Sequence, residues 1–76
     1  RQAMIDQMVE GLATRLRANP KDADGWIKLM RSRMVLGQAS QASRDLASAR
    51  KAFAGDAAQL GRIEAAAREL SVPAQP

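Results

Sequence analysis

The 76-residue sequence contains no cysteine and no histidine, and its only aromatic residues are Trp26 and Phe53. Without cysteine and histidine the chain has no disulfide, no zinc or iron–sulfur site of the usual ligand types, no cysteine nucleophile and no histidine general base. Two aromatic rings are too few to form a stacking platform for single-stranded nucleic acid. We therefore predict that the chain by itself is not an enzyme and that it binds no cofactor and no metal ion.

The charge of the sequence is mixed rather than concentrated. Twelve basic and eight acidic residues give a net charge of +4, and the two signs are interleaved along the chain. Proteins that bind nucleic acid gather basic residues on one face, so we predict no nucleic-acid partner.

The sequence has no run of about 18 apolar residues, the length that a membrane-spanning helix needs. It has no signal peptide and does not begin with methionine, so we expect it to be a fragment or a processed piece.

Apolar residues recur every three or four positions along most of the chain, which is the spacing of one helical face. Pro20, Gly37 and Gly55 interrupt this pattern and divide the chain into four segments. A proline biases the residue before it away from the helical region, and a glycine readily adopts the left-handed conformation that ends a helix. No segment alternates apolar and polar residues as a half-buried strand does. The sequence therefore predicts an all-α fold of about four helices, with short loops and antiparallel neighbours.

The sequence repeats itself weakly with a period of 34 residues. Asp22 aligns with Asp56, each a candidate helix N-cap, and Leu12 aligns with Leu46. A period of 34 residues with two helices per unit is that of the tetratricopeptide repeat (TPR). A generic four-helix bundle with an accidental period is the alternative. The TPR interpretation predicts antiparallel helix hairpins: the second helix of one repeat over 2–18, a full repeat over 23–56, the first helix of the next over 57–70, and a flexible C-terminal tail over 71–76.

The unit over 23–56 carries the residue types that this repeat uses for packing. Small residues let its helices approach closely, large apolar residues fill the space between them, and a glycine forms the turn. These signature residues are Trp26, Leu29, Gly37, Ala42, Leu46 and Ala49. Three positions depart from the pattern: Met30 replaces a usual small residue, Arg33 the usual aromatic residue and Ala54 the usual closing proline. Trp26 stands at an inter-helix position and is expected in the core rather than at a binding site.

Methionines and glycines within the predicted helices have more than one interpretation. The methionine pairs with a spacing of four are Met4 with Met8 and Met30 with Met34. Thioether ligands suit copper(I), but no histidine or cysteine completes such a site, so we interpret these methionines as core-filling side chains. The glycines within helices are Gly11, Gly25 and Gly61, and each costs about 1 kcal/mol relative to alanine. Close helix contact would explain them, or a partner that lies against Gly61.

Partners of a TPR array bind its concave face, which the first helix of each repeat lines. The residues predicted to line such a groove here are Ile27, Arg31, Met34, Gly61 and Arg68. Apolar residues beside arginines suit an amphipathic helix with acidic flanks or a free carboxylate. In the equally open alternative, the arginines are solvated and the apolar residues bury against another copy. The 2–18 segment also leaves Met4, Ile5, Met8 and Val9 without a preceding unit to cover them, so a homo-oligomer is expected at high protein concentration.

The sequence MVEGLATRL at 8–16, followed by NPKDADGW at 19–26 and LMRSRMVLG at 29–37, resembles the periplasmic TPR region of the CcmI/CycH family of bacterial c-type cytochrome biogenesis proteins. The resemblance covers roughly residues 4–72. It implies a location at the periplasmic face of the bacterial inner membrane, with anchorage only through parts of the parent protein that are absent here. It also implies a parent protein that holds apocytochrome c, largely by its C-terminal helix, and delivers it to the haem-ligation machinery. The alternatives are a self-associating structural TPR element and a general TPR adaptor in another assembly system.

Overall fold

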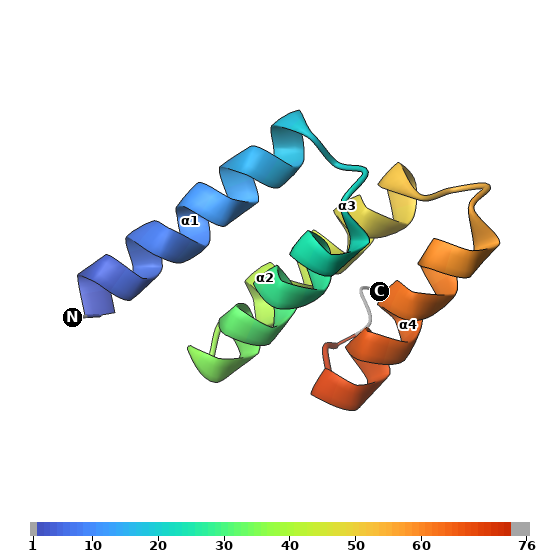
Figure 1. Cartoon of the computed structure of the whole chain (residues 1–76). Helices are drawn as coiled ribbons and strands as arrows, with labels where there is room; N and C mark the ends of the chain where they lie inside the picture. Colours follow the sequence, from blue (N-terminus) through green and yellow to red (C-terminus); the bar gives the residue numbers. More distant parts are fainter. Residues whose placement is uncertain (1, 74–76) are drawn as a thin grey trace.

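The computed structural model describes residues 2–73, and their side chains from Met4 onward. It contains four α-helices: α1 (Gln2–Ala18), α2 (Ala23–Val35), α3 (Ala39–Ala52) and α4 (Ala57–Leu70). Consecutive helices run in opposite directions, so α1 and α3 point one way and α2 and α4 the other (Figure 1). The described residues contain no strand. The predicted all-α fold of TPR-like antiparallel hairpins is confirmed.

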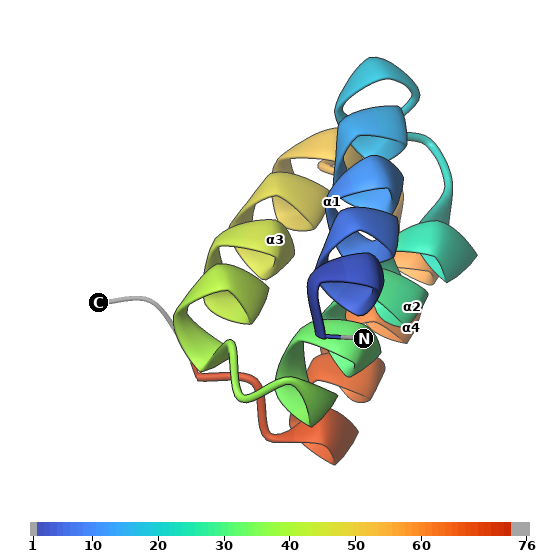
Figure 2. The ribbon, with the colours of Figure 1, turned by 90° about the vertical axis from the view of Figure 1, so that its left-hand side faces the viewer.

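The second helix is the centre of the molecule. α2 packs against all three other helices, most extensively against α3, then against α4 and then against α1. In the view of Figure 2, α2 and α4 lie one behind the other on one side of the molecule, and α3 lies on the opposite side. α4 also packs against α3, so it contacts both helices of the hairpin that precedes it.

Helix ends follow from single residues of the connecting loops. Asp22 Oδ1 accepts a hydrogen bond of 3.0 Å from the backbone N–H of Gly25, and Asp56 Oδ1 accepts one of 3.2 Å from that of Gln59. Both aspartates are therefore N-caps, as the sequence predicted. Gly37 (φ +74°) and Gly55 (φ +89°) follow α2 and α3 in the left-handed conformation, which glycine adopts without steric cost.

The hydrophobic core lies around α2. Trp26 is 2% exposed, and its indole Nε1–H donates a 2.8 Å hydrogen bond to the carbonyl oxygen of Pro20, in the loop that precedes α2. The other large side chains of the core are Leu16, Leu29, Met30, Leu46, Phe53 and Ile63. Ala42 and Ala49 of α3 are also fully buried, which places small side chains in the packed interior of the hairpin. The sixth signature residue, Gly37, lies in the turn.

The segment after α4 folds back onto the helices. The backbone N–H of Val72 donates a 2.9 Å hydrogen bond to the carbonyl oxygen of Ala67, and the Val72 side chain packs against the core. Ser43 Oγ donates a 2.8 Å hydrogen bond to the carbonyl oxygen of Pro73. The first three residues of the predicted tail over 71–76 thus contact α3 and α4. Its last three residues, 74–76, lie outside the described residues.

The helical glycines have different surroundings, and this predicts opposite effects of alanine. A Cβ at Gly25 would lie 2.6 Å from Asp22 Oδ2 and 2.8 Å from Leu16 Cδ2, whereas one at Gly11 or Gly61 would meet nothing within 4 Å. Asp22 is held by its N-cap bond and Leu16 by burial, so Gly25→Ala should destabilise the fold by about 1 kcal/mol. Gly11→Ala and Gly61→Ala should each stabilise it by up to about 1 kcal/mol. Urea denaturation measures all three, and a stabilised Gly25→Ala variant would contradict the close approach.

Candidate protein-binding surface

An apolar groove of about 650 Å³ lies between α1 and α2, which run side by side in Figure 1. α1 contributes Ile5, Met8 and Leu12 to its lining, α2 contributes Val35, and Leu36 follows directly after α2. Met8 is 74% exposed and Val35 81% exposed, although both side chains are apolar. Burial of such side chains is favourable, so this surface gains free energy when another apolar surface covers it.

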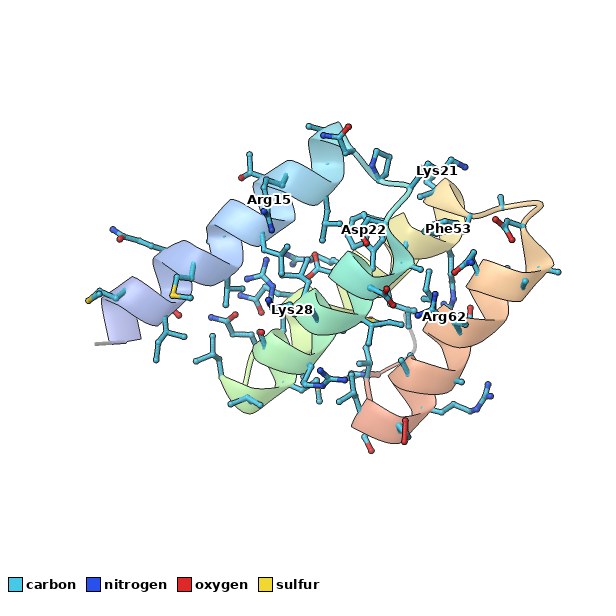
Figure 3. All side chains as sticks on the ribbon, in the orientation of Figure 1. Arg15, Lys21, Asp22, Lys28, Phe53 and Arg62 are labelled. Carbon is cyan, nitrogen blue, oxygen red and sulfur yellow. The ribbon has the colours of Figure 1, made fainter. Side chains whose placement is uncertain are left out.

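Three cations stand among the apolar residues of the groove: Arg15 of α1, and Lys28 and Arg31 of α2. Arg15 and Lys28 project into the space between the two helices (Figure 3). None of the three side chains forms an ion pair or a hydrogen bond with another described side chain. The groove therefore combines an apolar lining with positive charge that is not neutralised, a combination suited to an amphipathic helix with acidic residues at its edges.

The five residues predicted to line a concave groove lie on two helices. Arg31 is exposed on α2 and lines the groove against α1. Ile27 and Met34 are half-buried on α2, and Ile27 packs against the core. Gly61 and Arg68 are exposed on α4 and do not reach the groove between α1 and α2. Of the predicted set, the structure brings only Arg31 to this groove.

The contribution of α1 to this surface was missed, although its signal was present in the sequence. Met4, Ile5 and Met8 were expected to lack a preceding unit that covers them, and all three are exposed. The interpretation of Met4 and Met8 as core-filling side chains is therefore wrong. Val9 was expected to be uncovered as well, and this was wrong because its side chain belongs to the core cluster. Neighbouring positions on a helix point about 100° apart, so Met8 and Val9 face different surroundings.

Arg33 is buried and joins three helices. Its side chain stands where an aromatic residue was expected, and the residue is 4% exposed. Nε donates a 3.0 Å hydrogen bond to Asp45 Oδ2 on α3, and Nη1 donates to Glu10 Oε2 on α1 at 2.6 Å and to Gln38 Oε1 at 3.2 Å. These partners occupy the guanidinium, so Arg33 supports the fold and is not available to a partner protein.

The two carboxylates beside Arg33 respond to it differently. The hydrogen bond from Arg33 lowers the pKa of Glu10, whose side chain is largely in water. Burial raises the pKa of Asp45 although Arg33 bonds it, because the Asp45 side chain is only 13% exposed and its charge loses solvation. The two pKa values therefore shift in opposite directions because Glu10 is exposed to solvent and Asp45 is mostly buried, although both bind Arg33.

Further ion pairs connect α4 to the preceding hairpin. Arg50 of α3 binds Glu64 of α4 through both carboxylate oxygens, with Nη2 2.8 Å from Oε1. The hydrogen bond from Arg50 lowers the pKa of Glu64. Arg62 of α4 pairs with Asp24, in the first turn of α2. These pairs help to fix the orientation of α4 relative to α2 and α3. They add little stability, since exposed ion pairs contribute about 0–1 kcal/mol.

Within residues 2–73, no group of three histidine, cysteine, aspartate or glutamate side chains could hold a metal ion. Met30 is fully buried, so it and Met34 do not form a surface pair of thioethers. None of the helices described is both long and apolar enough to span a bilayer.

Comparison with known proteins shows which protein family the chain resembles. No family model matches it, and no solved structure matches it. The cytochrome c-type biogenesis protein CycH of Rhizobium meliloti (strain 1021) is 42% identical over 74 residues, which are 97% of this chain and 19% of that protein. The protein of the same name from Bradyrhizobium diazoefficiens is 38% identical over 72 residues, 95% of this chain and 20% of that protein. The chain thus spans about one fifth of the length of these relatives, and the predicted resemblance is confirmed: the chain is homologous to a segment of the CycH-type c-type cytochrome biogenesis proteins.

Proposed function

We propose that the chain is a non-catalytic protein-interaction module of a cytochrome c maturation factor, and that it helps to hold apocytochrome c for haem attachment. The homology to CycH proteins supports a role in cytochrome c maturation. The parent protein would act at the periplasmic face of the inner membrane and pass its client to the haem-ligation machinery. The observation that carries the binding role is the exposed face of α2 and α4, where Arg31 and Arg68 form no ion pair with another described residue.

The chemistry of this face suits the C-terminal helix of a client. Ile27 and Met34 are half-buried, so a client would cover only the remainder of each side chain and gain less than the ~1.5–3 kcal/mol of full burial. Arg31 and Arg68 would pair with acidic side chains or with the terminal carboxylate, and solvent would screen these pairs. The entropy lost on association offsets several kcal/mol of such contacts. We therefore expect micromolar or weaker affinity.

An NMR titration with a peptide of the apocytochrome c C-terminal helix tests the proposal. Chemical-shift changes should be confined to α2 and α4, and Arg31→Glu and Met34→Asp should each weaken binding about tenfold, since one lost contact of about 1.4 kcal/mol is a factor of ten. Arg44→Glu is the matched control, because Arg44 is also exposed but lies on α3. Saturable binding that ignores Arg31→Glu and Met34→Asp would contradict the proposed face. Absence of binding by a longer parent polypeptide would contradict the function.

A further inference from the structure

We propose that the groove between α1 and α2 is the seat of an amphipathic helix of the same polypeptide, namely the first helix of a repeat that precedes α1. The repeat division predicted from the sequence makes α1 and α3 equivalent helices, and likewise α2 and α4. Of the residues that we assign to the client face, only Arg31 also lines this groove, and Ile27, Met34, Gly61 and Arg68 lie outside it.

Equivalent positions on α1 and α3 differ in what covers them. α3 packs against two helices, α2 and α4, whereas the extensive contact of α1 is with α2. Three positions of α3 are therefore buried while their equivalents, 34 residues earlier, line the groove. The buried positions are Ala42, Leu46 and Ala49, and the equivalents on α1 are Met8, Leu12 and Arg15. A helix placed against α1 as α2 is placed against α3 would occupy the groove.

Charge gives a second, independent indication. Arg62 of α4 pairs with Asp24 in the first turn of α2. The residue 34 positions before Arg62 is Lys28, which projects into the groove and has no ion-pair partner among the described residues (Figure 3). A helix seated in the groove would bring its own first turn to Lys28, in the relation that α2 has to α4. An acidic residue in that turn would then complete the pair.

The two ends of the molecule are not alike. The exposed large apolar side chains of the described residues are Met4, Ile5, Met8 and Val35, all at the end formed by α1 and α2. α4 exposes none, and Val72 packs beside it against the core. Terminal units of repeat arrays carry a polar outer face, which fits α4 and not α1. CycH relatives are about five times as long as this chain, which is length enough for further repeats.

The occupant is therefore an amphipathic helix that runs parallel to α2 and antiparallel to α1. Its apolar stripe would cover Met8, Leu12 and Val35. Its acidic residues would face Arg15 and Lys28. A second copy of the chain and a client helix are the competing occupants, and the experiment distinguishes them.

Oxidation of methionine tests the proposal, because peroxide converts exposed methionine to its sulfoxide and mass spectrometry locates each product. In the dilute 76-residue chain, Met8 should react quickly and the fully buried Met30 slowly. In the longer polypeptide that carries this sequence, Met8 should react about tenfold more slowly while Met30 stays slow. Equal rates for Met8 in the two polypeptides would overturn the proposal. It would equally fail if Met8 of the short chain became protected with rising concentration, or on addition of the apocytochrome peptide, without the preceding segment.

Variants give a second measurement. Met8→Lys and Val35→Lys alter exposed side chains, so they should leave the melting temperature of the 76-residue chain nearly unchanged. They should lower that of the longer polypeptide by several degrees, because there the charge would be buried. Gln41→Lys on the exposed surface of α3 is the control and should be neutral in both. If the longer polypeptide tolerates Met8→Lys and Val35→Lys as well as it tolerates Gln41→Lys, the groove holds no helix.

Discussion

Replacing Trp26 with alanine is expected to remove most of the stability of the fold. The side chain is 2% exposed and its indole N–H bonds the carbonyl oxygen of Pro20, so alanine would leave both a cavity and an unpaired carbonyl. Such a truncation costs about 3–5 kcal/mol. A domain of this size buries only about 60% of the surface that its unfolded chain exposes. Its free energy of unfolding is therefore at the lower end of the usual ~5–15 kcal/mol. Far-ultraviolet circular dichroism during urea titration measures the loss.

Trp26→Phe separates the two contributions of this residue. Phenylalanine retains most of the apolar contact but cannot donate the hydrogen bond to Pro20. This variant should therefore stay folded and lose about 1 kcal/mol, the usual net contribution of one hydrogen bond, because Pro20 is only half-buried. A Trp26→Ala variant that is no less stable than Trp26→Phe would show that Trp26 is not central to the core.

Arg33→Ala should destabilise the fold by about 3 kcal/mol, the effect of removing one partner of a buried ion pair. It leaves the Asp45 carboxylate, whose side chain is 13% exposed, without its cation, and it removes the connection between α1 and α3. Arg31→Ala is the matched control, since Arg31 lies on the same helix, is exposed and forms no ion pair with a described residue. The control should change stability by less than about 0.5 kcal/mol.

Two further readouts identify the cause of that loss. Asp45→Asn removes the buried charge, so it should recover part of the stability of the Arg33→Ala variant. NMR titration should show the pKa of Glu10 returning upward to its ordinary range when Arg33 is absent. Equal stability of Arg33→Ala and Arg31→Ala would contradict the importance of the buried cation.

The pH dependence of the wild-type chain follows from the same pKa shifts. The pKa values of Glu10 and Glu64 are lowered in the folded state, so their pairs stabilise the fold above the unfolded-state pKa and are lost as pH falls through the folded one. The pKa of Asp45 is raised, so the folded state binds this proton more readily than the unfolded state does. Protonation of Asp45 at low pH therefore favours the folded state, which is the opposite of the effect at Glu10 and Glu64. Acid destabilisation is therefore expected to come from Glu10 and Glu64.

The sequence by itself determined the helices and their ends. Asp22 and Asp56 act as N-caps, and Gly37 and Gly55 end helices, because each works through backbone atoms a few residues away. The 34-residue period aligned these local signals and predicted hairpins. The likeness to CycH proteins also required nothing beyond the order of residues.

Only the tertiary structure decided which side chains are covered. Periodicity places Met8 and Val9 on the same broad apolar side of α1, yet Val9 enters the core and Met8 lines an open groove. Arg33 is charged, and its burial depends on Glu10 and Asp45, which lie on two other helices. Ile27 was expected to face a partner, and it is half-buried, with part of its side chain packed against the core. A helical pattern fixes the direction of a side chain relative to its own axis, whereas burial depends on which distant segment packs there.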